Sequence, residues 1–405
     1  MRIFGYELKK ILNWKILLVL VLFTILYVVS TPLGNLTYSN DMYGEISVCR
    51  ILLQKYGTEM DTGEQKDFEH TILPELKKEA NQRLATIPTL QKTGVQDVDA
   101  LDSLLQKDTD RYTEISNLIE SHESKDSPFY AYENAEVMVN PLRDKQNTAA
   151  QMQKLSDFSG SDTASAKIRE CIRNPNFSTL PMNIFSQWQL FISELSNLLL
   201  LSVIVVITPF LVRERRSNVR KLAYTCRKGR SLFGTQFAAA VTAVLLVILI
   251  QSLILGCTYW HDFVGIVEPF LQCRLNMIGC GLYFWRLLPF GQFMLLEWLA
   301  VILFSLGIGI LSFLISRACK NYVTAIAVQL PVVWLGLLLS ETMTGDCLQV
   351  QKIHFNEILH FSMDWVTQCA SHLRYFEPVL CATLVLLPLA VCLVLIHREK
   401  AREML

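Results

Sequence analysis

The sequence lacks the short motifs that mark common catalytic and nucleotide-binding sites. It contains no G-x-x-x-x-G-K-[ST] phosphate loop and no G-x-S-x-G nucleophile elbow. None of its 11 cysteines falls in a C-x-x-C pair, and no paired metal-ligand spacing is present. We therefore expect no catalytic residue, no metal and no cofactor in this chain. If it drives an active process, the energy must come from an ion gradient or from a separate ATPase subunit.

Charged residues are scarce as well. They make up 18% of the 405 residues, whereas 51% are hydrophobic, which is too apolar for an ordinary soluble protein of this length. Six segments carry no charged residue over a length that crosses a hydrocarbon core, which takes roughly 20 helical residues. These segments are Ile16–Leu33, Leu195–Val212, Ser231–Trp260, Trp298–Ser316, Asn321–Ser340 and Pro378–Ile396. We expect an all-α integral membrane protein with six transmembrane helices.

The few charges that are present are distributed by sign. Residues 213–231 hold eight Lys and Arg against one acid, Glu214. Together with the N-terminus, the turn at Arg317 and Lys320 and the C-terminal tail, they give 17 basic and four acidic residues. Gly34–Phe185, by contrast, holds 16 basic and 24 acidic residues. Because short loops rich in Lys and Arg stay in the cytoplasm, this pattern places both termini and residues 213–231 inside the cell.

This topology divides the chain into segments with different roles. We expect a cytoplasmic amphipathic helix at 1–12, span 1 at 13–33, a helical extracytoplasmic domain at 34–186 and a five-span transmembrane domain at 187–405. The last of these contains the cytoplasmic loop 213–231 and two apolar outer segments, 261–291 and 341–377. Since their aromatic residues would be costly in water, the outer segments either dip into the membrane or cover the outer mouth of the bundle.

Two apolar repeats predict helices in the extracytoplasmic domain. A three-four spacing runs from Val98 to Ile119 and is broken only at Asp108, which predicts one long helix. A second helix is predicted over Phe68–Ala80, interrupted by Pro74. The net negative charge of this domain either attracts cationic ligands or only keeps its surface solvated.

Prolines and small residues in the later spans indicate a packed bundle. Proline frees a backbone carbonyl that neighbouring helices must satisfy, and small residues four positions apart allow close helix approach. The residues concerned are Pro209, Pro331 and Pro388, and the pairs Gly234/Ala238 and Ser305/Gly309.

Two acids in or beside apolar spans, Glu194 and Glu297, are candidate substrate-path residues. Counted from the cytoplasmic ends of their spans at 1.5 Å per residue, they lie about 27 and 28 Å up, near the outer interface. The alternative is that both are interfacial carboxylates held by water. A proton relay is less favoured, because it needs charge buried at the midplane.

The N-terminal helix and the basic loop together carry a family resemblance. ELKKIL in the first helix, a large outer domain after span 1, and PFLVRERRSNVRKLAYTCRKGRSLFGTQFAAAV after span 2 resemble the permease subunit of a type-two ATP-binding-cassette exporter. The acid, mid-loop apolar residue, Gly-Arg pair and span start of that pattern correspond to Glu214, Leu222, Gly229, Arg230 and Gln236. Where Gln236 stands, the family often has Lys.

The resemblance implies a dimeric permease, either a homodimer or a heterodimer with a related chain, bound to cytosolic ATPase subunits that carry ATP and Mg. The coupling residues would be Glu214, Arg215, Arg216, Arg220 and Lys221, with Phe4 and Leu8 of the N-terminal helix as a second contact. LLQKYGTEMDTGEQKDF also resembles permeases of Gram-positive bacteria, which implies a bacterial plasma membrane. A peptide, in particular a cationic antimicrobial peptide, a drug or a lipid would each suit as substrate, and no nucleic-acid partner is expected.

Two other classes remain open. The chain is alternatively a non-transporting membrane sensor or scaffold, whose outer domain binds a ligand or partner. A secondary transporter is disfavoured, because no midplane charge or inverted repeat is visible. The basic loop also has a simpler interpretation, in which it fixes topology and contacts anionic membrane lipid, worth about 1 kcal/mol per basic residue.

Overall fold

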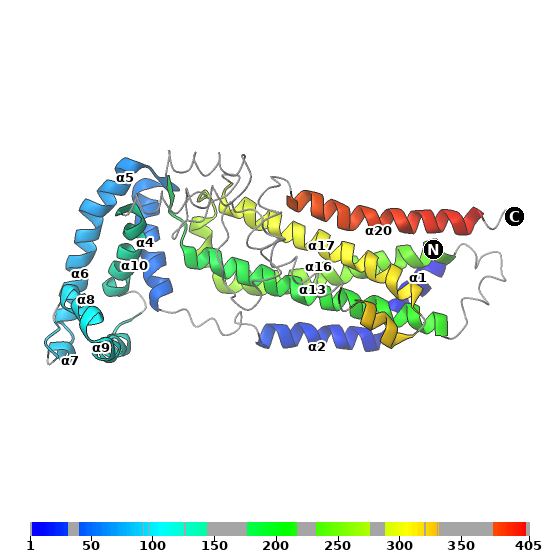
Figure 1. Ribbon diagram of the computed structural model, residues 1–405, viewed down its shortest axis with the longest axis horizontal. Coiled ribbons are helices and arrows are strands. Elements are labelled where there is room, and N and C mark those ends of the chain that lie inside the picture. The colour runs from blue at the N-terminus through cyan, green and yellow to red at the C-terminus, as the bar shows by residue number, and fades with distance from the viewer. Residues whose placement is uncertain are drawn as a thin grey trace.

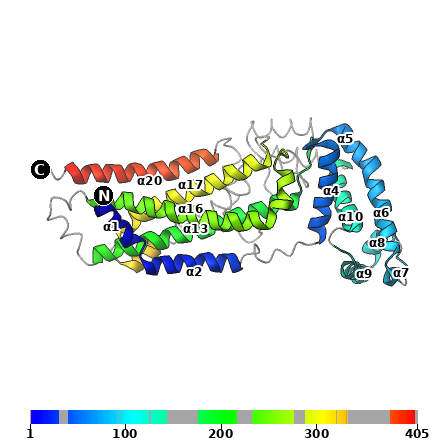
Figure 2. The same cartoon turned by 180° about the vertical axis from the view of Figure 1, so that it is seen from behind.

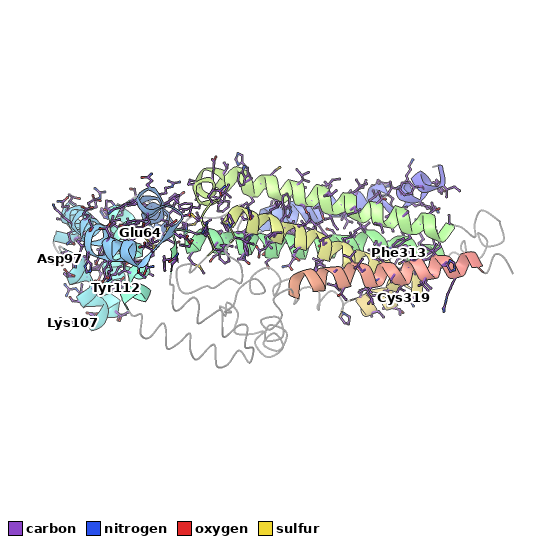
Figure 3. All side chains as sticks on the ribbon, turned by 90° about the horizontal axis from the view of Figure 1, so that it is seen from above. Glu64, Asp97, Lys107, Tyr112, Phe313 and Cys319 are labelled. Atoms are coloured by element: carbon purple, nitrogen blue, oxygen red, sulfur yellow. The ribbon has the colours of Figure 1, made fainter. Side chains whose placement is uncertain are left out.

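The computed structural model of the chain describes residues 2–30, 40–91, 93–95, 97–124, 127–143, 176–216, 232–275, 288–319, 321–329, 331 and 376–401. Over these residues the long elements are all helices. They form an elongated bundle with a smaller helical domain at one end, as Figure 1 shows. Figure 3 labels Glu64 and Asp97 in the smaller domain, while Phe313 and Cys319 lie towards the other end of the bundle.

The bundle consists of long apolar helices that run side by side (Figure 1). They are α2 (Trp14–Ser30), α13 (Met182–Arg216), α16 (Leu232–Val267), α17 (Phe290–Ala318) and α20 (Phe376–Ala401). Among the described residues, three helices are long and apolar enough to cross a membrane, and the bent pair α1–α2 makes a fourth candidate. Only the first part of the predicted fifth span, Asn321–Ser340, is described, namely residues 321–329 and 331, so a count of six stays a prediction.

The predicted N-terminal helix is α1 (Arg2–Ile11), and it ends where the sequence provides a new helix start. The side-chain oxygen of Asn13 accepts hydrogen bonds from the backbone N–H groups of Lys15 and Ile16, at 3.1 and 3.2 Å. Asparagine is a favoured N-cap because it satisfies donors that the first helical turn leaves open. The chain therefore bends by 48° between α1 and α2.

The predicted spans are the central parts of longer helices. The segment Leu195–Val212 lies within α13, which begins at Met182 and continues through Pro209 to Arg216. Likewise α16 extends past Trp260 to Val267, so the first part of the predicted outer segment 261–291 continues the span. Its residues Phe263 and Phe270 are fully buried, which supports the covering role over insertion into lipid. The segment 341–377 lies outside the described residues except for its last two.

Glycines on α17 set how closely its neighbours approach. A Cβ on Gly309 would lie 2.9 Å from a methyl of Val203 and 3.0 Å from one of Val244, and a Cβ on Gly307 would lie 2.8 Å from the carbonyl oxygen of Leu384. Such distances are too short for any side chain, so both glycines hold helices in close contact, as small residues do in membranes. The close approach expected at Gly309 is confirmed.

The other small-residue pair does not act in this way. The nearest atom to a Cβ on Gly234 is a methyl of Ile396 at 3.9 Å, an ordinary contact, and Ala238 is exposed. The expectation of close packing at Gly234/Ala238 is wrong within the described part of the chain.

The smaller domain is helical, as predicted. It contains α4 (Asn40–Tyr56), α5 (Thr62–Asp67), a π-helical turn (Phe68–Ile72), α6 (Leu73–Ala85), α7 (Pro88–Gln91), α8 (Val98–Lys107), α9 (Thr109–His122) and α10 (Pro128–Arg143). The short strands β1 (Glu59–Met60) and β2 (Phe177–Ser178) pair antiparallel. Helices α4 and α10 cross tightly at Gly44, where a Cβ would lie 2.5 Å from the carbonyl oxygen of Tyr130.

The two predicted helix interruptions have different outcomes. At Asp108 the expected long helix is two helices: the backbone leaves the helical region there (φ −152°, ψ 86°), and the Asp108 carboxylate accepts the N–H of Arg111 and caps α9. The prediction of one helix fails because aspartate competes with the backbone and favours caps. Pro74, in contrast, is accommodated as the second residue of α6, directly after the π-helical turn.

The smaller domain is fastened to the start of α13. The Glu45 carboxylate on α4 accepts the backbone N–H groups of Met182 and Asn183, at 2.6 and 2.9 Å. A carboxylate at a helix N-terminus satisfies open donors and complements the helix dipole. Burial raises the pKa of Glu45, while the two backbone hydrogen bonds act in the opposite direction. Two further links join the domain to the bundle, Arg50 to the carbonyl of Gly265 and an ion pair between Arg274 and Glu59.

Candidate functional site

Three helices meet around one carboxylate at the end of the bundle far from the smaller domain. Glu214, close to the end of α13, accepts the ammonium group of Lys10 from α1 at 3.0 Å and the side-chain amide of Gln236 from α16 at 2.7 Å. Lys10 also pairs with Glu7, at 2.8 Å. We call Glu7, Lys10, Glu214 and Gln236 the inner node. Figure 2 shows α1 lying across the ends of α13 and α16.

The amphipathic pattern of α1 brings its charges to this place. Glu7 is only 2% exposed, on the face of α1 that packs against the bundle, and Lys10 follows one turn later. A buried carboxylate is costly unless a cation compensates it, and Lys10 compensates both Glu7 and Glu214. The node is therefore an ion network that holds three helices together, rather than one isolated surface pair.

The apolar residues of α1 take a different place from the one expected. Phe4 and Leu8, predicted to contact a partner, are half-buried and pack against the hydrophobic core of the bundle. The exposed apolar residues are Ile3 and Tyr6, and Tyr6 also receives Lys10 over its ring at 5.0 Å. A contact of Phe4 and Leu8 with a partner stays a prediction.

The predicted basic residues of the loop are only partly placed. Arg215 and Arg216 form the last two residues of α13, so the polar stretch begins within a helix. Arg220 and Lys221 lie outside the described residues. The structure therefore brings Glu214 together with Lys10 and Gln236, and the side chains of the four basic candidates lie outside what it describes.

A second polar group lies one to two turns deeper in the bundle, beside Pro209. The amide oxygen of Gln329 accepts hydrogen bonds from Thr208 on α13 and Ser312 on α17, each at 3.1 Å, and its amide nitrogen donates to Ser316 at 2.6 Å. All four side chains are buried. Tyr322 adds a hydrogen bond to the carbonyl oxygen of Pro209, at 3.2 Å.

Sequence reasoning missed this cluster because none of its members is charged. The available signal was that each of three apolar segments contains an isolated Ser, Thr or Gln, and that Thr208 directly precedes Pro209. Such side chains hydrogen-bond across helices in membranes.

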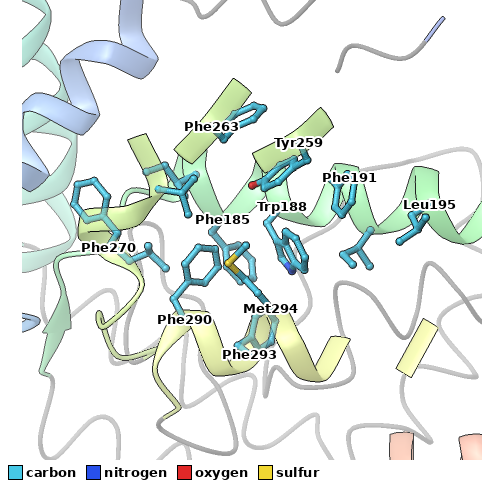
Figure 4. Close-up of a cluster of buried hydrophobic side chains, with 14 of the residues drawn as sticks. Phe185, Trp188, Phe191, Leu195, Tyr259, Phe263, Phe270, Phe290, Phe293 and Met294 are labelled. Carbon is cyan, nitrogen blue, oxygen red and sulfur yellow. The ribbon is translucent and has the colours of Figure 1, made fainter. Parts of the chain in front are cut away.

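The outer end of the bundle is built differently. Glu297 on α17 is 3% exposed and accepts the indole N–H of Trp188 at 2.6 Å and the amide of Gln189 at 3.1 and 3.2 Å. Figure 4 shows the aromatic residues that surround this place. They are Phe185, Trp188, Phe191, Tyr259, Phe263, Phe290 and Phe293, with neighbouring ring centroids between 4.6 and 6.5 Å. We call Glu297 with these rings the outer cluster.

The two candidate substrate-path acids are not brought together. Glu297 is buried within the bundle, so the expectation of an interfacial carboxylate held by water is wrong for it. Glu297 bonds to Trp188, and the Trp188 ring packs against Phe191 and Tyr259 of the outer cluster. The position of Glu297 along its helix gave no sign of this aromatic packing. Glu194 is half-buried on α13 and interacts electrostatically with Tyr27 of α2. A path that uses both acids would have to open the outer cluster first.

These features define an all-helical membrane protein in which an ion network joins α1, α13 and α16 at one end of the bundle. A family model described as ABC-2 family transporter protein matches residues 9–344, which is most of the chain. The chain therefore belongs to the ABC-2 family of transporters, as the membrane-embedded permease. ABC-2 permeases have no catalytic activity of their own and pair with an ABC ATPase that is a separate subunit. No curated protein and no solved structure matches the chain.

Proposed function

We propose that the chain is the six-spanning permease subunit of an ATP-driven exporter, and that the inner node couples it to the ATPase. The observation that carries the proposal is the position of Glu214. It links the end of α13 to α1 and to the start of α16. Helices α13 and α16 are the two elements that flank the basic loop 213–231. A force applied to this loop therefore acts on three helices at once.

In this mechanism the chain performs no chemistry, and the partner ATPase binds ATP and Mg. Closure of the ATPase subunits displaces the loop and the exposed face of α1. The inner node transmits the displacement to α13 and α16, and the cluster around Gln329 passes it to α17. The side chains of Lys10 and Glu214 are only partly buried, at 32% and 15% exposed. The ion pair between them therefore breaks and re-forms at a low free-energy cost during each cycle.

The test compares two lysines of one helix. Lys10→Met removes the cation of the node, while Lys9→Met removes an exposed cation one residue away and serves as the matched control. Glu214→Gln removes the anion but keeps the size of the side chain. Each variant is purified with its ATPase subunit in nanodiscs, and complex formation and ATP hydrolysis with and without transported substrate are measured.

We expect Lys10→Met and Glu214→Gln to assemble with the ATPase and to lose most of the substrate-stimulated hydrolysis. Lys9→Met should retain it. If both node variants hydrolyse ATP and export like the parent chain, the node has no coupling role. If neither they nor the parent chain bind any ATPase, the exporter assignment itself fails.

The substrate and the oligomer belong to the same proposal. The acidic outer domain supports a cationic peptide as cargo, because its charge raises the local concentration of cations. Susceptibility of a deletion strain to cationic peptides, against an uncharged drug as control, tests this choice. A dimer, formed with a second copy or a related permease, follows from the family's pairing with ATPase subunits, and native mass spectrometry of the complex reports it.

The sensor alternative makes a different prediction for the outer domain. In this alternative, the contact between Glu45 and the start of α13 would carry an event at the smaller domain to the bundle. Deleting 40–176 abolishes all function of a sensor, whereas an exporter keeps basal coupling to its ATPase.

A further inference from the structure

The proline inside α13 is a weak point between the body of the bundle and Glu214. Pro209 has no backbone N–H, so the carbonyl of Val205, one turn earlier, loses its usual helical partner. Helices bend at such positions unless their neighbours hold them. Glu214 lies beyond the proline, about 7.5 Å further along the helix axis. A bend at Pro209 would therefore displace Glu214 relative to α17.

Three of the buried side chains beside this proline form a closed ring of hydrogen bonds. The amide nitrogen of Gln329 donates to the hydroxyl of Ser316 at 2.6 Å, and Ser316 donates to the hydroxyl of Thr208 at 3.4 Å. Thr208 donates back to the amide oxygen of Gln329 at 3.1 Å, and Ser312 adds a second donor to the same oxygen, also at 3.1 Å. Each hydroxyl has one proton to give, and each proton has a partner.

The segment that carries Gln329 also contacts α13 at the proline and beyond it. The hydroxyl of Tyr322 donates to the carbonyl oxygen of Pro209 at 3.2 Å. Val212, on the far side of the proline, is fully buried and packs with Ala325 in a small hydrophobic cluster separate from the main core. Residues 321–329 therefore hold α13 before, at and after its weak point.

We propose that Gln329 is a positioning residue for Glu214. The cluster around Gln329 holds the two parts of α13 on either side of Pro209 in one relative position, and so places Glu214 for its contacts with Lys10 and Gln236. A glutamine suits this role because one end of its side chain both accepts and donates. Inside the bundle, hydroxyls that lose these partners find no water in exchange. The consequence for coupling rests on the exporter proposal, whereas the positioning concerns this chain alone.

Hydrogen exchange of the full-length protein in nanodiscs tests the positioning without any ATPase. Thr208→Val keeps a similar shape and removes the hydroxyl, whereas Thr208→Ser keeps the hydroxyl. We expect the backbone amides of residues 210–216 to exchange about fivefold faster in Thr208→Val, the equivalent of one hydrogen bond, and at the parental rate in Thr208→Ser. Gln329→Leu removes three hydrogen bonds and should accelerate this exchange more than about tenfold.

The matched control is a second buried glutamine. Gln251 on α16 is 3% exposed and bonds across helices to Thr24 on α2, at 3.1 Å. Gln251→Leu should leave the exchange of residues 210–216 unchanged. Parental exchange there in both Thr208→Val and Gln329→Leu overturns the proposal. An acceleration spread over all helices alike, or equally large in Gln251→Leu, also overturns it, because the cluster would then only stabilise the bundle as a whole.

The consequence for coupling has a separate readout in the complex with the ATPase. Thr208→Val should lose most of the substrate-stimulated hydrolysis, and adding Lys10→Met should cost little more, since both changes act through Glu214. If the exchange changes as expected but Lys10→Met hydrolyses ATP like the parent chain, the coupling proposal fails and the positioning stands. If the exchange stays parental while Lys10→Met is uncoupled, the positioning fails and the coupling proposal stands.

Discussion

The inner node and the outer cluster each place a glutamate between helices of the bundle, and they use it in opposite ways. Glu214 is paired with a cation, its side chain is 15% exposed, and its partners Lys10 and Gln236 come from two different helices, α1 and α16. Glu297 is almost fully buried, and it accepts hydrogen bonds from Trp188 and Gln189, which are adjacent residues of one helix. The first arrangement tolerates movement between its members, and the second resists it.

The difference follows from dielectric and from rigidity. Around Glu214, solvent screens the charges, so individual bonds contribute little and reform in new geometries. Around Glu297, the aromatic rings exclude water, and each donor and acceptor becomes expensive to leave unpaired. The partly exposed node therefore suits the coupling role proposed for it, whereas the buried cluster at the opposite end of the bundle suits a stabilising role.

The largest expected effect comes from removing the outer carboxylate. Glu297→Ala leaves the Trp188 indole and the Gln189 amide without their acceptor inside a dry cluster, and opens a cavity there. We expect a loss of about 3 kcal/mol in the free energy of unfolding. Thermal unfolding in detergent, followed by size-exclusion chromatography, measures it. A stability equal to that of the parent chain would show that the outer cluster is open to solvent.

Removing one donor while keeping the ring gives a smaller effect at the same place. Trp188→Phe preserves aromatic packing against Phe191 and Tyr259 but deletes the 2.6 Å hydrogen bond to Glu297. The expected loss is about 1.5 kcal/mol in the free energy of unfolding, half that of Glu297→Ala. Combined with Glu297→Ala, it should add little, since both changes remove the same bond.

At the inner node we expect weak stabilisation that depends on salt. A double-mutant cycle with Lys10→Met and Glu214→Gln should give a coupling free energy of about 0.5–1 kcal/mol, as for partly exposed pairs. Raising ionic strength should reduce it, because ions screen exposed charges. A coupling free energy several times larger and insensitive to salt would show that the inner node is as well shielded from solvent as the outer cluster. The contrast drawn between Glu214 and Glu297 would then be wrong.

The smallest effect concerns the cation over the ring beside the node. The guanidinium of Arg317 on α17 lies 3.7 Å from the ring centroid of Phe233 on α16, and Phe233 stacks on Phe313. Arg317→Lys keeps the charge and loses the planar stacking, so we expect about 0.5 kcal/mol of lost stability. Arg317→Gln should lose somewhat more. Differential scanning fluorimetry of both variants, compared at one pH and salt, resolves the order.

Much of this architecture was readable from local sequence. Apolar length predicted the helices that became α13, α16 and α17, and the amphipathic pattern of residues 1–12 predicted a helix distinct from the first span. Glu214 stood out because it is the sole acid in a basic stretch. Its pairing with Lys10 could not be predicted, because the two residues are 204 positions apart and only the bend at Asn13 brings them together.

The remaining features depended on three-dimensional packing. The burial of Glu297 follows from rings contributed by α13, α16 and α17, and no single stretch of sequence reveals that convergence. The cluster around Gln329 joins helices whose polar residues each look incidental. The hydrogen bond between Gln251 and Thr24 likewise forms only because α2 lies against α16 at that height.

The continuity of α13 has one more consequence. This helix is 35 residues long, about 52 Å, and runs from the backbone groups held by Glu45 at one end of the bundle to Glu214 at the other. A helix is stiff along its axis, and Pro209 is the one proline in α13 at which it could bend. In the proposed exporter, a cargo that moves the smaller domain would therefore displace the far end of α13, where the contact with the ATPase is proposed, through a single continuous element.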